Sequence, residues 1–118
     1  MDGRSDVNLG KNLFILENQV IQNRVVIGNN VMLWSGNHVG HGSKIGDSTY
    51  LSSHVVISGH TTIGERCFFG VNSATRDFVT IGNGCFIAMG ANVLKDIPDS
   101  TSVMPYQSPV IEGEKSAR

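Results

Sequence analysis

The histidines of this chain are the side chains best suited to acid–base chemistry, and two of them stand within four residues of each other. His38 and His41 lie in a glycine-rich segment, residues 33–47, that reads LWSGNHVGHGSKIGD. Imidazole titrates close to neutral pH, so it can accept the proton of a hydroxyl or amine that attacks a carbonyl carbon. His54 and His60 follow within nineteen residues of His41. General-base chemistry is therefore the first chemistry that this sequence suggests.

An apolar residue at every sixth position organises the chain that must hold these histidines. Thirteen of fourteen such positions are apolar, and Thr75 is the exception. From Val25 onward a small or β-branched residue stands two places before each of these positions, with Asn37 as the one exception. Glycine often follows the apolar residue, which indicates tight corners. The series is Ile15, Ile21, Ile27, Leu33, Val39, Ile45, Leu51, Ile57, Ile63, Phe69, Thr75, Ile81, Ile87 and Val93.

A period of six fits neither an α-helix nor a long strand, and it predicts short strands separated by turns. Three such strands make a coil of eighteen residues, because the Ile-Gly pairs at 27–28, 45–46, 63–64 and 81–82 recur at that spacing. Each strand would pair in parallel with the equivalent strand of the next coil, about 4.8 Å along the axis. The predicted fold is all-β, a parallel β-helix shaped as a triangular prism.

The length of 118 residues leaves room for one domain. We expect an N-terminal lead-in over 1–8, the β-helix over 9–97 and a C-terminal extension over 98–118 that is partly disordered. Apolar residues between 103 and 111 could pack back on the prism or on a neighbour, whereas the polar tail from 112 to 118 is expected to be loose.

Composition excludes several classes of function. The formal net charge of −1 gives no basic surplus for nucleic acid, and no apolar run is long enough to predict a membrane span. The first residues lack the layout of a secretory signal, so a cytoplasmic location is expected. Cys67 and Cys85 are too few for a disulfide framework, and their eighteen-residue spacing predicts a reduced pair stacked in one inward column.

Stacking by eighteen residues also brings the candidate catalytic residues together. Gly59 is predicted directly above His41, and His60 directly above Gly42, so His41 and His60 occupy adjacent coils near one edge. His54 falls on another edge. The missing side chain at Gly59 would let a substrate approach the backbone closely beside the imidazole.

The repeat, which covers most of the chain, resembles the hexapeptide-repeat acyltransferases. The resemblance implies a left-handed winding and a homotrimer whose active sites lie between neighbouring prisms. The words WSGNHVGH at 34–41, SHVVISG at 53–59 and FGVNS at 69–73 are similar to sugar acyltransferases of the sialic acid O-acetyltransferase type and to related amino-sugar acetyltransferases. The implied activity is transfer of an acetyl group from acetyl-CoA to a hydroxyl or amine of a sugar or nucleotide sugar.

This resemblance also implies roles for individual residues. His41 stands where the family has its catalytic base, and the backbone of Gly59 stands where it meets the acetyl carbonyl. Val71, Met89 and Lys95 fall where family members line the CoA groove. For contacts to the acceptor, the candidates are Asn37, His38, Tyr50 and His60, although Asn37 also fits a buried amide that is hydrogen-bonded to neighbouring coils.

Several positions depart from the family pattern. Many relatives place an acidic residue or histidine directly after the base, where this chain has Gly42, so the partner that orients His41 is unidentified. Some relatives have a second histidine where Tyr50 stands. Many also precede the prism with an α/β domain that grips the sugar nucleotide, and no such segment precedes residue 9. The acceptor and the choice between oxygen and nitrogen stay open.

Two other functions remain to be weighed. A γ-type carbonic anhydrase shares the prism, but it holds zinc with three histidines at whole-coil spacings, and only His41 and His60, nineteen residues apart, come close. No metal is therefore expected. A chain that is nearly all prism could instead be a non-catalytic trimeric scaffold, or a remnant without its sugar-binding domain.

Overall fold

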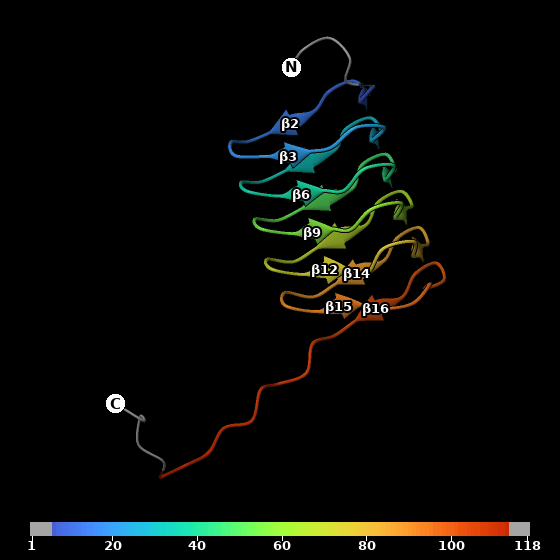
Figure 1. Ribbon diagram of the computed structural model, residues 1–118. Coiled ribbons are helices and arrows are strands. Elements are labelled where there is room, and N and C mark those ends of the chain that lie inside the picture. The colour runs from blue at the N-terminus through green and yellow to red at the C-terminus, as the bar shows by residue number, and fades with distance from the viewer. Residues whose placement is uncertain (1–5, 114–118) are drawn as a thin grey trace.

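The structure, a computed structural model, describes residues 6–113, and these form short strands and turns without a helix (Figure 1). Each strand has two residues. The strands are β1 Asn8–Leu9, β2 Phe14–Ile15, β3 Val20–Ile21, β4 Val26–Ile27, β5 Met32–Leu33, β6 His38–Val39, β7 Lys44–Ile45, β8 Tyr50–Leu51, β9 Val56–Ile57, β10 Thr62–Ile63, β11 Phe68–Phe69, β12 Ala74–Thr75, β13 Thr80–Ile81, β14 Phe86–Ile87, β15 Asn92–Val93 and β16 Ser102–Val103.

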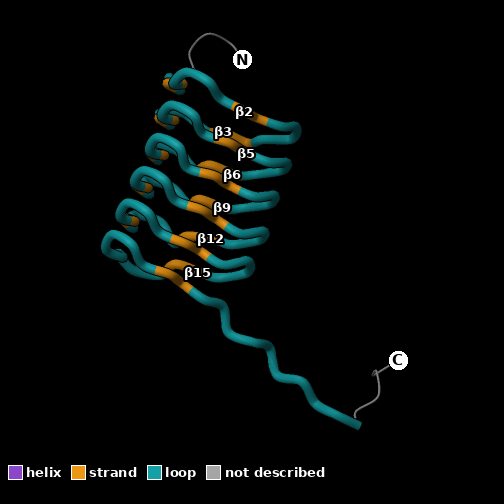
Figure 2. The backbone as a smooth tube through the Cα atoms, turned by 180° about the vertical axis from the view of Figure 1, so that it is seen from behind, coloured by secondary structure: helices purple, strands orange, loops and turns teal. Residues whose placement is uncertain are grey.

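These strands build three parallel sheets, one along each side of a prism. Sheet A is ordered β1-β4-β7-β10-β13, sheet B β16-β14-β11-β8-β5-β2 and sheet C β15-β12-β9-β6-β3. From β1 to β15 every strand pairs with the strand one coil away in a register of eighteen residues, as in Val39 opposite Ile57. The prediction of an all-β, left-handed parallel β-helix is confirmed (Figure 2).

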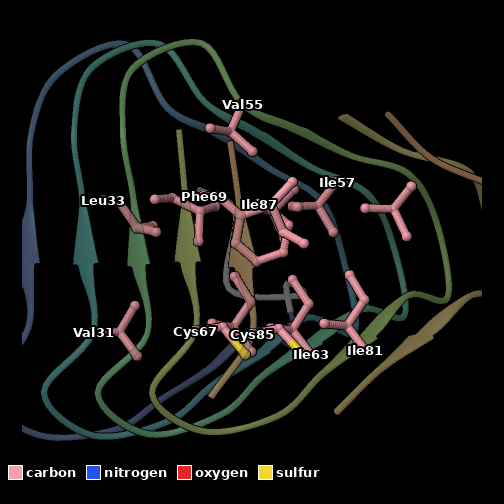
Figure 3. Close-up of a cluster of buried hydrophobic side chains, with 14 of the residues drawn as sticks. Val31, Leu33, Val55, Ile57, Ile63, Cys67, Phe69, Ile81, Cys85 and Ile87 are labelled. Atoms are coloured by element: carbon pink, nitrogen blue, oxygen red, sulfur yellow. The ribbon is translucent and has the colours of Figure 1, made fainter. Parts of the chain in front are cut away.

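The second residue of each strand points into the prism, which explains the hexad pattern. Ile27, Leu33 and Val39, from three different sides of one coil, are each at most 1% exposed. Figure 3 shows such side chains converging on the axis from all three sheets, with Phe69 and Ile87 at the centre of the view. Each buried aliphatic side chain contributes roughly 1.5–3 kcal/mol. Burial repeated in every coil therefore holds the stack together.

Some inward residues of the prism are not aliphatic, among them an asparagine and two cysteines. Asn37 is 1% exposed; its Nδ2 donates to Trp34 O at 2.8 Å, and its Oδ1 accepts the N–H of Val55 at 2.8 Å. Cys67 and Cys85 are buried free thiols in one column, as the spacing predicts. Burial raises the pKa of the Cys67 thiol above its ordinary value, because desolvation disfavours the thiolate.

The last coil is two residues shorter than the others. Ile81 pairs with Ile97 and Ile87 pairs with Val103, each over sixteen residues, whereas Thr75 still pairs with Val93 over eighteen. The shortening therefore falls between 93 and 97. After it the chain resumes the prism and adds β16, beyond the end at residue 97 that the sequence predicts.

Beyond β16 the chain leaves the prism and runs away from the last coil (Figures 1 and 2). Met104, Tyr106, Val110 and Ile111 are all more than half exposed, so among the described residues the extension does not pack back on the prism. The predicted loose tail lies mostly in residues 114–118, and part of the lead-in lies in 1–5; both stretches fall outside the described residues.

The three outer faces of the prism differ in character. Sheet B carries a ladder of aromatic rings on its outer side, where Tyr50 stacks on Phe68 at 5.2 Å between ring centroids and Phe68 on Phe86 at 5.3 Å. Sheet C exposes Val20 and Val56. The outer residues of sheet A are mostly polar, namely Asn8, Val26, Lys44, Thr62 and Thr80. Sheet A is thus the face best suited to water.

Candidate active site

His41 lies on the corner where each coil turns from sheet C to sheet A. We call this the histidine corner, and it comprises residues 22–25, 40–43, 58–61 and 76–79. The backbone N–H of His60 donates to His41 O at 2.9 Å, so these two residues sit in adjacent coils as the stacking predicts. The side chain of His41 is exposed at the edge of the prism. A base at this position is open to substrate.

Gln22, from the coil below, contacts the imidazole of His41. Its Oε1 accepts the backbone N–H of His41 at 2.9 Å and lies 3.2 Å from Nδ1 of the same residue. The sequence did not identify this contact, because an eighteen-residue period places Gln22 beneath Gly40 and not beneath His41. The only sequence signal for this contact is that Gln22 is polar and stands one residue before the position that the repeat places beneath His41.

Gly59 lies against the other side of the imidazole. A Cβ built on Gly59 would lie 3.3 Å from Cε1 and 3.4 Å from Nε2 of His41, so the absent side chain leaves an open space beside Nε2. Within residues 6–113 the N–H of Gly59 donates no hydrogen bond, whereas the N–H groups of Ser58 and His60 donate to Thr75 Oγ1 and His41 O. The imidazole of His41 therefore lies next to a backbone N–H that has no partner among the described residues.

Among the described residues, other corners of the prism also have a backbone N–H at their outer point that donates no hydrogen bond. The corner between sheets A and B differs, because acidic and amide side chains accept the equivalent groups there: Asn29 N–H donates to Asp47 Oδ1 at 2.8 Å and Asn83 N–H to Asp99 Oδ1 at 2.7 Å. Gly59 is distinguished by its missing side chain and by the imidazole below it.

His60 forms a second wall of the site. Its ring meets the ring of His41 edge-on, with centroids 4.9 Å apart, and stacks on Phe78 at 4.8 Å with the planes 13° apart. The same ring covers Gly42, where a Cβ would lie 2.5 Å from Nδ1 of His60 and where φ is +72°. A side chain at position 42 would require the exposed ring of His60 to move aside.

A cluster of buried hydroxyl groups lies behind the site and holds the peptide before Gly59. Thr75 Oγ1 accepts the N–H of Ser58 at 3.1 Å and lies 3.2 Å from Thr61 Oγ1. Thr61 Oγ1 donates to Ser58 O at 2.7 Å, and Ser43 Oγ donates to the same oxygen at 3.0 Å. The one polar member of the apolar series, Thr75, thus serves the backbone of the histidine corner.

Val71 and Met89 lie on a different corner of the same chain. They stack in the turn from sheet B to sheet C, where residues 70–73 and 88–91 form the B–C corner, and the whole width of sheet C separates them from His41. Tyr50 points outward from sheet B. One chain alone does not bring these three residues to the imidazole.

The remaining predicted residues are divided between the site and the rest of the prism. His60 lies in the site, and His38 lies on the outer side of sheet C between Val20 and Val56. Asn37 is inside the prism with its amide satisfied, so the predicted acceptor contact does not fit and the buried-amide interpretation does. Its position two places before an inward valine dictates that burial.

Lys95 is exposed in the shortened turn between 93 and 97. It borders an open apolar hollow of about 390 Å³ at the end of the prism, lined also by Asn92, Val93, Leu94, Ile97 and Val103.

No group of three or more His, Cys, Asp or Glu side chains that could hold a metal ion occurs among residues 6–113. In the same part of the chain, no helix could cross a membrane.

Comparison with protein families identifies the repeat. The model described as "Bacterial transferase hexapeptide (six repeats)" matches residues 24–59, and the model "Hexapeptide repeat of succinyl-transferase" matches residues 60–95. The two matches are contiguous and together span the coils that carry the histidine corner. No curated protein matches the chain significantly.

Solved structures share this fold. The perosamine N-acetyltransferase PerB from Caulobacter crescentus, solved with CoA and GDP-perosamine, is 29% identical with a TM-score of 0.81, over 82% of this chain and 47% of PerB. The acetyltransferase domain of PglB from Neisseria gonorrhoeae is 23% identical with a TM-score of 0.64, over 86% of this chain and 55% of that one. LpxA from Acinetobacter baumannii is 21% identical with a TM-score of 0.65, over 84% and 41%.

The chain therefore spans about half the length of the relatives that it matches. Its fold, its repeat and the two contiguous family matches agree over residues 24–95. On these grounds residues 24–95 carry the hexapeptide repeat of the bacterial hexapeptide transferases.

Proposed function

We propose that this protein transfers an acetyl group from acetyl-CoA to an amino or hydroxyl group of a sugar or nucleotide sugar, with His41 as general base. The observation that carries the proposal is the space between Nε2 of His41 and the free N–H of Gly59. Acyl transfer from a thioester needs those two functions, a base at the attacking atom and a donor at the developing oxyanion.

The reaction follows from this arrangement in two steps. As the acceptor attacks the thioester carbonyl, its N–H or O–H proton passes to Nε2 of His41, and the Gly59 N–H stabilises the negative charge on the carbonyl oxygen. When the tetrahedral intermediate collapses, the C–S bond breaks and the CoA thiolate takes the proton from the imidazolium. Both steps use one base and require no covalent enzyme intermediate.

The acceptor class rests on similarity to PerB, which was solved with CoA and GDP-perosamine. His60 and Phe78 stand beside the base, and Phe78 is 70% exposed, so this aromatic pair can contact the acceptor. His38 is a further candidate for contact with the acceptor. The nitrogen of an amino sugar is the favoured nucleophile because the similar perosamine N-acetyltransferase of Caulobacter crescentus is named as an N-acetyltransferase.

We further propose that the active protein is a homotrimer. Val71, Met89 and Tyr50 are separated from His41 within one prism, so they can meet it only if they belong to a neighbouring copy. The aromatic ladder of sheet B is an apolar surface of the kind that subunit interfaces cover. A threefold ring closes such head-to-tail contacts and gives three equivalent sites. Lys95 is proposed to contact the CoA phosphates.

The test uses acetyl-CoA and a panel of nucleotide-linked amino sugars, with release of free CoA thiol as the signal. We expect the wild-type chain to release thiol with at least one acceptor, and His41→Ala to lower kcat by about a hundredfold or more. Thr62→Ala, on the polar outer side of sheet A, should keep wild-type activity. Calorimetry without heat at millimolar acetyl-CoA, together with no thiol release, would refute the proposal and favour the non-catalytic scaffold.

A further inference from the structure

We infer that Gln22 is the positioning residue of His41, replacing the acidic partner that position 42 does not supply. This inference rests on the proposed function, because it concerns the same base. The amide of Gln22 reaches two atoms of His41, its backbone nitrogen at 2.9 Å and Nδ1 at 3.2 Å, from the coil below. No other described side chain is hydrogen-bonded to the imidazole.

The backbone contact decides which way round the amide of Gln22 lies. A backbone N–H can only donate, so the atom of Gln22 that faces it must be the carbonyl oxygen, Oε1. That same oxygen can only accept from Nδ1, which must therefore carry the proton. In the neutral ring the lone pair then lies on Nε2, the nitrogen that faces Gly59. One hydrogen-bonded amide fixes the tautomer needed by a general base.

The packing above His41 explains why the partner comes from below. The ring of His60 fills the space over Gly42, where a Cβ would come within 2.5 Å of it. A side chain at position 42 could enter only if that ring moved aside. The coil beneath the imidazole is open to a side chain, and Gln22 enters from there, directly after the inward Ile21.

A neutral amide orients the imidazole without adding a negative charge beside it. The ionisable groups nearest along the same corner are His60, whose ring meets that of His41 edge-on at 4.9 Å, Arg24 one coil below, and the pair Arg76 and Asp77 one coil beyond Gly59. Arg24 is already paired with Asp6 at 3.5 Å. The pH dependence of the base should therefore respond strongly to a carboxylate introduced at position 22.

Two variants separate orientation from charge. Gln22→Met keeps the length of the side chain but removes the acceptor, and we expect kcat to fall roughly ten- to a hundredfold with KM for acetyl-CoA unchanged. Gln22→Glu keeps the acceptor and adds a charge that stabilises the imidazolium, so the acidic limb of the pH–rate profile should move up by about one unit. The sign follows because the base must be neutral to act.

Gln19→Met is the matched control. Gln19 lies in the same coil, and its Nε2 donates to Trp34 O on the B–C corner, so its loss removes a hydrogen bond between coils without touching His41. We expect kcat and the pH profile of this variant to match wild type. A Gln22→Met enzyme with wild-type kcat, or a Gln22→Glu profile that does not move, would overturn the positioning role.

A measurement that needs no activity keeps this inference separate from the proposed function. ¹⁵N NMR of labelled histidine, with His41 assigned through His41→Ala, reports which ring nitrogen is protonated at high pH. We expect Nδ1–H in wild type and a shift toward Nε2–H in Gln22→Met. The same tautomer in both proteins would overturn the inference, whether or not any acceptor is acetylated; absence of activity with the expected tautomers would count against the proposed function alone.

Discussion

Gly59 is the position at which a single added carbon should separate folding from catalysis. Its φ lies outside the left-handed region, and an added Cβ would meet His41 Cε1 at 3.3 Å, a contact that a small movement of the exposed imidazole relieves. The methyl group would, however, fill the space where the thioester carbonyl must lie between Nε2 and the Gly59 N–H. A small side chain at position 59 should therefore be compatible with folding but not with the reaction.

We therefore predict that Gly59→Ala folds with a melting temperature near that of wild type but loses about a hundredfold in kcat/KM, comparable to the loss of an oxyanion donor. Thermal denaturation and thiol release measured on the same preparation test this. Thr80→Ala, on sheet A, is the control and should match wild type in both. An alanine variant with full activity would show that no substrate uses this space.

At the scale of the strand, β12 departs from the hexad pattern for a reason that lies in the corner next to it. Thr75 points inward from β12 and is 4% exposed, yet it ends in a hydroxyl that accepts the N–H of Ser58. Thr61 in turn binds the carbonyl of the same residue at 2.7 Å. Ser58, the residue before Gly59, is therefore held at both its N–H and its C=O.

Thr75→Val restores the apolar series, and we predict that it impairs the enzyme. The unfolding free energy should fall by only about 1 kcal/mol, since the lost hydrogen bonds are partly offset by the apolar methyl group. In contrast, kcat should fall about tenfold because the donor at Gly59 is less well aligned. Thr75→Ser should recover most of the activity.

Thr49→Val provides a matched loss on another corner. Thr49 Oγ1 donates to Gly64 O and accepts the N–H of Cys67, so it is a buried hydroxyl that holds the backbone between sheets A and B and makes no contact with Ser58 or Gly59. Its stability cost should equal that of Thr75→Val while kcat stays at the wild-type value. Equal losses of kcat in the two variants would mean that the hydroxyl groups act on stability alone.

The whole molecule raises the question of which copy supplies which part of the site. The corners of the prism are occupied by different candidate residues. His41 and Gly59 share one corner, whereas Met89 and Val71 share another. If both corners contribute to catalysis, each site contains two chains.

Mixing two inactive variants tests this sharing of the site. His41→Ala removes the base, and Met89→Glu sets a negative charge against the CoA phosphates at an exposed position. Each homotrimer should be inactive, but random exchange at equal amounts should restore about a quarter of wild-type activity, because one site in four then draws both intact residues from different chains. Sedimentation checks that each variant keeps the oligomeric state of wild type. If no activity returns after subunit exchange has been verified, the sharing of the site is refuted. His41 and Met89 would then act within the same chain, or not act in catalysis at all.

The sequence by itself determined the prism and the columns inside it. A side chain that recurs every six residues and stacks every eighteen can only be buried by parallel coils, so the inward series, the buried Asn37 and the proximity of His41, Gly59 and His60 all follow from counting. This part of the structure is local and repetitive. Backbone hydrogen bonds and burial impose the same register in every coil from β1 to β15.

Only the tertiary structure decided what crosses between columns. Gln22 contacts His41, although the eighteen-residue repeat places it beneath Gly40, and the ring of His60 occupies the space over Gly42. The repeat does not predict either contact, because both depend on the length and direction of a side chain. The two-residue shortening that holds Lys95 is likewise a break in the repeat itself. Repetition fixes where each Cα lies along the stack, whereas packing fixes which neighbouring side chains meet.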